Sequence, residues 1–199
     1  MKFVFGKQDM MTAARAQENC WLLGNGLGGF TSTTAAFSVT RNDHGILVAA
    51  RTAPNDRVNL VHRLSEKLIL GEKAFFLSTQ DFADGKAGED GYRHLSSFAV
   101  EYGPQWVYEV DGVHVERRCA IADGSNTVAV CYRAENRSDF PCTIEITPWM
   151  QLAPKGNAPQ GPFKLRFSNG KVSGNGLSVR VKTDAVLEKT ATVCETLDY

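Results

Sequence analysis

The chain has 199 residues, of which 43% are hydrophobic, and its 22 acidic residues balance its 22 basic residues. This length is sufficient for one domain with a substantial core. The basic residues form no evident stripe, which argues against a nucleic-acid-binding protein, because such binding depends on clustered Lys and Arg. No apolar run approaches the roughly 20 residues of a membrane-spanning helix, and the N-terminal apolar run is too short for a signal peptide. We therefore expect no nucleic-acid partner and no membrane association.

One helix is predicted, over Gln8 to Gln17, where good helix formers precede Asn19. Almost every later segment is typical of a strand, because β-branched and aromatic residues alternate with polar ones. Asp111-Gly112 and Asp123-Gly124 are turn signals between strands. In chain order, strands are predicted at Trp21–Leu23, Ile46–Ala50, Val58–Leu70, Phe75–Leu77, Ser97–Tyr102, Trp106–Val110, Val113–Ile121, Thr127–Arg133 and Cys142–Trp149, the last of which is ended by Pro148.

A surface loop rich in Pro and Gly is predicted over Gln151 to Pro162. Short strands joined by turn signals follow at Phe163–Ser168, Lys171–Ser173, Leu177–Lys182 and Ala185–Lys189. Short strands at a spacing of roughly 8–12 residues with turn signals indicate an all-β sandwich. We expect residues 1–199 to form one such domain. No evident closing element stands at the end of the chain, which suggests part of a longer protein.

The most unusual segment places four glycines within the six positions from Gly24 to Gly29. It fits the G-x-G-x-x-G pattern of dinucleotide-binding sites, and Asp43 lies near the distance expected for a ribose-binding acid. That site also requires a helix directly after the glycines, whereas the residues that follow are β-branched or carry hydroxyls. We therefore favour a tight turn between two strands, in which valine at Gly26 or Gly28 would disturb the backbone if φ is positive there. No cofactor is predicted.

A complete active site is not expected within this chain. A glycoside hydrolase needs two carboxylates roughly 5–10 Å apart, whereas the acidic residues here are scattered along strands and turns. The chain has no Gly-x-Ser-x-Gly elbow and no other recognisable nucleophile. Its five cysteines are odd in number and widely spaced, which is typical of reduced, buried thiols in the cytosol. We predict no catalytic residue and no metal site.

Several polar and aromatic residues are candidate ligand contacts. The segment from Thr40 to Gly45 gathers side chains that could bind sugar hydroxyls or a neighbouring domain, although an ordinary polar turn has the same composition. Tryptophans could stack on sugars, or could belong to the core. The predicted substrate-binding set is Asn25, Arg41, Asp43, His44, Trp106 and Trp149.

Two blocks of this sequence resemble a known family. Trp21-Leu-Leu-Gly-Asn-Gly-Leu-Gly-Gly-Phe30 and Arg41-Asn-Asp-His-Gly-Ile-Leu-Val-Ala49 are similar to two blocks of the N-terminal domain of bacterial and archaeal-type glycogen debranching enzymes, the amylo-α-1,6-glucosidase family. Pro104–Tyr108 and Asn126–Tyr132 resemble later strand motifs of that family. Asn42 and Asp43 depart from the commoner Arg and Tyr, so contacts made by those side chains do not carry over.

The resemblance implies a β-supersandwich from a cytoplasmic enzyme that hydrolyses α-1,6-linked glucose at glycogen branch points. It also implies that the catalytic carboxylates lie in a C-terminal (α/α)₆ barrel, and that this domain is non-catalytic. The domain would then pack on the barrel, contribute to recognition of glycogen or another branched α-glucan, and be inactive alone. Two alternatives are a self-standing carbohydrate-binding module and a self-sufficient enzyme that uses Asp43 or His44.

Overall fold

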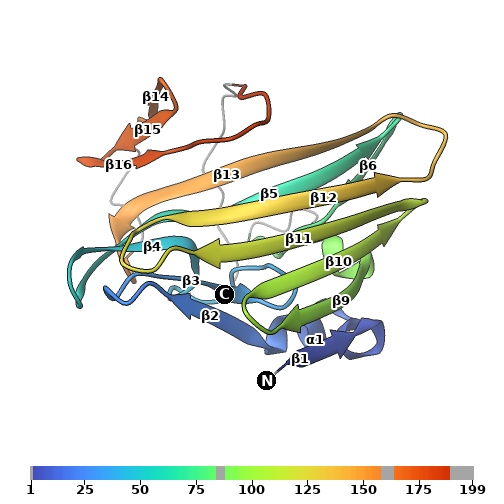
Figure 1. Ribbon diagram of the computed structural model, residues 1–199, viewed down its shortest axis with the longest axis horizontal. Helices are drawn as coiled ribbons and strands as arrows, with labels where there is room; N and C mark the ends of the chain where they lie inside the picture. Colours follow the sequence, from blue (N-terminus) through green and yellow to red (C-terminus); the bar gives the residue numbers. More distant parts are fainter. Residues whose placement is uncertain (1, 84–87, 158–163, 189–199) are drawn as a thin grey trace.

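The computed structural model describes residues 2–83, 88–157 and 164–188. Two antiparallel sheets pack face to face around a common core (Figure 1). Sheet A runs β1 (Phe3–Gly6), β9 (Leu95–Val100), β10 (Pro104–Val110), β11 (Val113–Ile121) and β12 (Val128–Asn136). Sheet B runs β13 (Cys142–Pro154), β5 (Asp56–Leu70), β4 (Gly45–Thr52), β3 (Phe30–Thr34) and β2 (Cys20–Gly24), and β6 (Lys73–Phe76) also pairs with β5. The predicted all-β sandwich is confirmed.

Two small sheets and three short helical segments complete the described residues. One small sheet contains β14 (Arg166–Ser168), β15 (Lys171–Gly174) and β16 (Leu177–Arg180), and the other pairs β7 (Thr79–Gln80) with β8 (Glu89–Asp90). The helical segments are the 3₁₀ turns η1 (Lys7–Met10) and η2 (Gly91–Arg93) and the helix α1 (Ala13–Glu18). None of the helices in the described part of the chain is long and apolar enough to cross a lipid bilayer.

The N-terminal helix is shorter than predicted. Instead of one helix over Gln8 to Gln17, the chain forms η1 and then α1, which begins only at Ala13. Thr12 separates them because its backbone is extended and its hydroxyl accepts a hydrogen bond from the backbone N–H of Arg15 (3.3 Å), which caps α1.

Two strand predictions also need correction. Pro148 does not end its strand: it pairs with Leu64, and β13 continues to Pro154, so the predicted loop from Gln151 starts later. β13 forms an edge of sheet B, where the missing N–H of proline is tolerated. The strand predicted from Ala185 to Lys189 does not form at residues 185–188, and Lys189 lies outside the described residues. Phe163, the first residue of another predicted strand, and most of the last six residues of the predicted loop also lie outside the described residues.

The predicted turns are confirmed where two residues join neighbouring strands. Asp111 and Gly112 join β10 to β11 with φ of +43° and +86°. The pairs Asn169-Gly170 and Asn175-Gly176 of the small sheet have positive φ at both positions in the same way. This left-handed geometry matches the twist of the strands and favours Asn, Asp and Gly.

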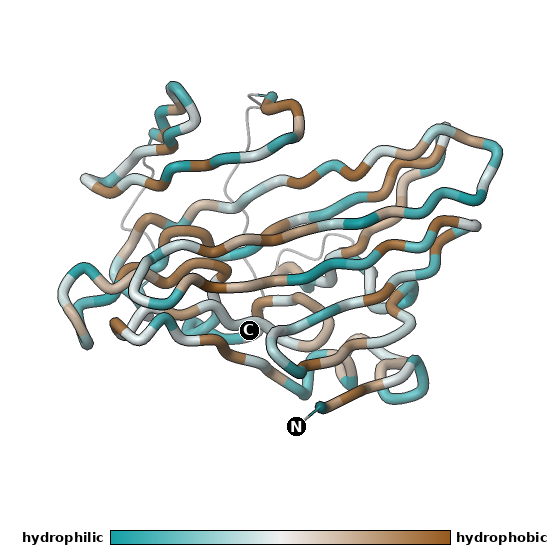
Figure 2. The backbone as a smooth tube through the Cα atoms, viewed as in Figure 1, coloured by the Kyte–Doolittle hydropathy of each residue, from teal (hydrophilic) through white to brown (hydrophobic). Residues whose placement is uncertain are grey.

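The core between the sheets is built around Trp106 of β10. Its ring contacts Trp21, Phe37 and Phe98, with ring centroids 5.1–5.5 Å apart, and its indole N–H donates to the Ala35 carbonyl at 2.7 Å. Hydrophobic and hydrophilic residues alternate along the strands (Figure 2), as expected for sheets with one buried face.

A charged group also lies in this core. The Arg117 guanidinium of β11 pairs with the Glu66 carboxylate of β5, and the Tyr132 hydroxyl of β12 donates to the same carboxylate. Arg117 and Glu66 are both fully buried. Because Glu66 belongs to sheet B and its two partners to sheet A, this ion pair ties the two sheets together.

Most of the cysteines predicted to be buried are not. Cys119 is buried, Cys142 is half-buried, Cys20 and Cys131 are exposed, and Cys194 lies outside the described residues. The four described cysteines are free thiols.

Candidate functional site

The glycine turn, residues 24–29, is a tight connection between β2 and β3. The backbone N–H of Asn25 donates to the carbonyl of Gly29 at 3.0 Å. Gly26 and Gly28 have φ of +76° and +96°, as predicted for a turn that needs glycine. Strand β3 begins at Phe30, directly after the turn, so no helix N-terminus is available to receive a pyrophosphate. The dinucleotide-site alternative is therefore wrong.

Asn25 is structural rather than ligand-facing. Its side chain is fully buried, its amide donates to the Ser125 carbonyl and to the Asn126 side chain (both 3.0 Å), and its oxygen accepts from the Leu27 N–H. Asn126 in turn bonds both backbone groups of Ala50 on β4. The prediction that Asn25 contacts substrate is thus not supported, because its hydrogen-bonding groups join the glycine turn to the β11–β12 turn and to β4.

The Arg–His bend, residues 40–45, leads into β4. The backbone N–H of His44 donates to the Arg41 carbonyl at 3.0 Å, and the His44 ring Nδ1 accepts from the Thr40 N–H at 3.2 Å. Arg41 is exposed, and the Asp43 side chain is 71% exposed, whereas His44 is buried. Of the predicted contacts on this bend, Arg41 and Asp43 are accessible to a ligand, and the His44 ring is not.

A buried amide links His44 to a second histidine. The Asn59 side-chain amide donates to the His44 carbonyl and lies 3.0 Å from the ring Nδ1 of His62. Burial, together with the nearby Arg41, lowers the pKa of His44 to about 4. Burial, with Arg63 and His44 nearby, likewise lowers the pKa of His62 to about 4. Both rings are therefore neutral near pH 7.

The glycine turn and the Arg–His bend meet at one surface. We call it the Phe30 surface, and it consists of Asp43, Pro54, Arg57 and Lys155 around the buried side chain of Phe30. The Arg57 guanidinium and the Lys155 ammonium lie 5.8 and 6.0 Å from the centre of the Phe30 ring. Lys155 also pairs with Asp43, and Arg57 donates to the Pro54 carbonyl at 3.0 Å. Gly28 lies against that same Pro54.

The two predicted tryptophans lie elsewhere. Trp106 has no exposed surface, so the prediction that its ring stacks on a sugar is wrong, and the alternative of a core residue is correct. Trp149 is half-buried on β13, with the Arg63 guanidinium 4.9 Å from its ring centre. Its role in sugar binding stays a prediction.

Comparison with protein families shows which family the chain belongs to. Residues 19–189 match the family described as glycogen debranching enzyme N terminal. The chain belongs to this family. Comparisons with curated proteins and with solved structures return no match. The match includes both the glycine turn and the Arg–His bend, so the segments that meet at the Phe30 surface belong to this debranching enzyme N-terminal domain.

The Phe30 surface of this debranching enzyme N-terminal domain has one carboxyl group among its five residues, that of Asp43. The hydrogen bond and charge of Lys155 lower the pKa of Asp43, so this carboxyl is ionised and is no proton donor near neutral pH. Burial raises the pKa of Glu66, but that carboxyl is fully buried and paired with Arg117. Within residues 2–83, 88–157 and 164–188, no three His, Cys, Asp or Glu side chains are grouped as metal ligands.

Of the five residues of the Phe30 surface in this domain, the sequence predicts only Asp43 as a ligand contact. Phe30 belongs to the family block, and no local signal singles out Pro54 or Arg57. Lys155 lies 112 residues after its partner Asp43, so no local pattern connects them. An isolated lysine in a Pro/Gly-rich stretch is the weak signal that was available.

The two neutral histidines predict acid sensitivity of the domain. Their pKa values are near 6.5 in the unfolded chain and about 4 in the fold, so between these pH values the unfolded chain binds more protons. The contribution of these histidines to the free energy of unfolding is therefore fully present above pH 6.5. It is lost as the pH falls towards 4, by up to about 3 kcal/mol for each histidine. Urea unfolding at a series of pH values measures this loss.

In the His44→Gln variant, the number of protons taken up on unfolding should decrease by about one, and the slope of the unfolding free energy against pH should decrease accordingly. His114 is the matched control, because it is more exposed and its hydrogen bond to Glu109 raises its pKa. An unchanged slope in His44→Gln would contradict the assignment of His44 as a buried neutral ring.

Proposed function

We propose that this chain is a non-catalytic domain of a cytoplasmic glycogen debranching enzyme, which packs on the catalytic barrel of the same enzyme and helps to recognise branched α-glucan. The single observation that supports this role best is the meeting of both family blocks at the Phe30 surface. Residues from three separate segments, around Phe30, Asp43 and Lys155, converge there although they are far apart in the sequence.

The composition of the Phe30 surface fits a neutral, hydroxyl-rich ligand. Arg57 supplies several N–H donors, as does the exposed Arg41 of the adjoining Arg–His bend, Lys155 supplies an ammonium, and Asp43 supplies a carboxylate that accepts hydrogen bonds. Sugar hydroxyls both donate and accept, so they need mixed partners of this kind. The opposite charges of Lys155 and Asp43 offset each other, and Arg57 can donate hydrogen bonds to a neutral ligand as well as to a charged one.

Exposed apolar residues beside the glycine turn support docking on another domain. Leu22 of β2 is 61% exposed and pairs with Ser32 of β3, which places it on the same face of sheet B as Phe30. Leu27, inside the glycine turn, is also exposed. Exposed apolar side chains that adjoin a polar surface are typical of protein interfaces. We assign this edge to the contact with the catalytic barrel.

Affinity electrophoresis in gels that contain glycogen tests the glucan role. We expect weak retardation of the chain, and the Arg41→Ala/Asp43→Ala variant should bind about fivefold or more weakly, since each lost hydrogen bond to a charged group contributes about 1 kcal/mol or more. The control variant Arg133→Ala/Glu135→Ala removes one charge of each sign from exposed positions of β12 and should migrate like the parent chain.

Two outcomes would overturn the proposal. Strong retardation that is lost in Trp149→Ala but kept in Arg41→Ala/Asp43→Ala would favour a self-standing carbohydrate-binding module. Release of glucose from a branched dextrin by the purified 199-residue chain would show a self-sufficient enzyme. For the proposed domain we expect no release of glucose.

A further inference from the structure

The charge of this chain is distributed unevenly, contrary to the expectation from its overall balance. No Asp or Glu occurs between Glu145 and Asp184, whereas the segment from residue 164 to residue 182 contains Lys164, Arg166, Lys171, Arg180 and Lys182. A segment with so many cations and no acid has a strongly positive local potential. This segment forms the small sheet of β14, β15 and β16.

The register of the small sheet gathers these cations on one face. Arg166 pairs with Ser173, which pairs with Ser178, and these three residues form one row across the sheet. Lys171 and Arg180 pair two residues further along the strands, so their row lies on the same face. Paired residues of neighbouring strands point to the same side of a sheet, with the strands about 4.8 Å apart. This face, here called the cationic face, therefore alternates guanidinium or ammonium groups with hydroxyls.

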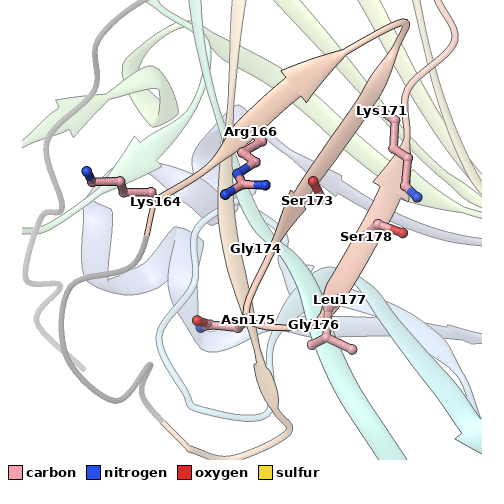
Figure 3. A pocket seen from close by; sticks show the side chains of 9 residues that line it. All are labelled: Lys164, Arg166, Lys171, Ser173, Gly174, Asn175, Gly176, Leu177 and Ser178. Carbon is pink, nitrogen blue, oxygen red and sulfur yellow. The ribbon is translucent and has the colours of Figure 1, made fainter.

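An open cleft of about 460 Å³ lies on the small sheet. Its lining includes Lys164, Arg166, Lys171, Ser173, Asn175 and Ser178. Figure 3 shows the side chains of Lys164 and Arg166 at the β14 side of the sheet, Lys171 and Ser173 of the central strand β15, and Ser178 of β16. None of the described residues that line this cleft carries a carboxylate.

The small sheet is held in place by its other face. Val179 is buried, and Leu177 packs against the core of the sandwich. The Asn175 side-chain amide also donates to the Leu152 carbonyl of β13 at 3.3 Å. Phe167, Val172 and Val179 pair in one row, so the aromatic ring of β14 points away from the cationic face. The cationic face is thus turned outward on a fixed support and carries no aromatic platform.

We propose that the cationic face binds a phosphate monoester. Among the described residues no carboxylate forms an ion pair with Lys164, Arg166, Lys171 or Arg180, so their charges are available to a ligand. Arginine and lysine bind phosphate oxygens by charge-assisted hydrogen bonds, and serine hydroxyls add neutral donors. Neutral glucans commonly stack on an aromatic ring, and none of the described residues that line the cleft is aromatic. The proposal does not depend on the glucan role of the Phe30 surface.

Isothermal titration and NMR titration with glucose 6-phosphate test the phosphate site, with unphosphorylated glucose as the neutral probe. We expect saturable binding of glucose 6-phosphate that weakens with added salt, and no binding of glucose to this face. The Arg166→Gln/Lys171→Gln variant should bind about tenfold or more weakly. The Arg118→Gln/Arg133→Gln variant removes the same charge from exposed positions of sheet A and should bind like the parent chain.

The source of the phosphate is distinguished by comparing glucose 6-phosphate with a phosphorylated dextrin. Tighter binding of the phosphorylated dextrin would assign the site to a phosphate carried on a glucan, and equal binding would assign it to a soluble sugar phosphate. The proposal is wrong if neither ligand binds below about 10 mM, if both double variants lose affinity equally, or if a single-stranded oligonucleotide binds this face more tightly than either. Circular dichroism of each variant shows that the fold is intact.

Discussion

Replacing Arg117 by methionine is expected to lower the free energy of unfolding by about 3–5 kcal/mol, because the change leaves the Glu66 carboxylate buried without its partner. The fully buried Arg117 guanidinium pairs with Glu66 and lies 3.5 Å from the centre of the Phe37 ring and 4.2 Å from that of Trp106. Burial already raises the pKa of Glu66. Without Arg117, this carboxyl must take up a proton or the sandwich must open. Urea unfolding at pH 7 measures the loss.

The double variant Arg117→Met/Glu66→Leu should recover most of this loss. When both charges are replaced by apolar groups of similar size, the cost of desolvating them also disappears. The Tyr132 hydroxyl then has lost its acceptor, so Arg117→Met/Glu66→Leu/Tyr132→Phe should be the most stable of the three variants. The double-mutant cycle of Arg117 and Glu66 gives their coupling energy directly.

The exposed pair of Arg51 and Asp56 is the matched control for the buried pair. Its N···O distance is 2.7 Å, but its side chains are 53% and 41% exposed, so solvent screens the interaction. Arg51→Met should therefore cost at most about 1 kcal/mol. If Arg117→Met costs no more than Arg51→Met, the buried ion pair does not hold the two sheets together.

Most of the strands and turns of this fold could be predicted because their signals are local. The alternation from Val113 to Ile121 and the Asp111-Gly112 turn together specify a hairpin, and the structure has that hairpin with Val110 paired to Val113. The glycine turn was predictable for the same reason, since Gly26 and Gly28 adopt backbone angles that other residues avoid.

The contacts between distant segments could not be predicted. Alternation shows that Trp106 and Tyr108 share a face, but both faces of a strand look alike until the opposite sheet is known, and this face is the core. Glu66 and Arg117 are 51 residues apart, and Asp43 and Lys155 are 112 apart. Each side chain alone is typical of a solvated surface, so its partner becomes evident only in three dimensions.

Replacing Gly28 by alanine is expected to destabilise the domain by about 3 kcal/mol or more, because backbone strain and a backbone clash add together. Its φ of +96° is unfavourable for any residue with a Cβ. A Cβ built there would lie 2.9 Å from the Cα of Pro54 and closer still to its carbonyl oxygen, so backbone would have to move. That carbonyl accepts the Arg57 hydrogen bond of the Phe30 surface, and the variant should therefore also weaken glycogen binding.

Gly124 separates strain from clash in this prediction. It has φ of +64°, but a Cβ there would meet nothing within 4 Å, so Gly124→Ala should cost only about 1 kcal/mol. Gly26 is intermediate, since its φ is +76° and a Cβ would lie 3.0 Å from a carboxylate oxygen of Asp123, whose side chain can move. Urea unfolding of the three alanine variants should therefore rank Gly28 as most sensitive, then Gly26, then Gly124. Equal losses at Gly28 and Gly124 would mean that the Pro54 segment moves aside at little cost, and that the glycine turn does not position the Phe30 surface.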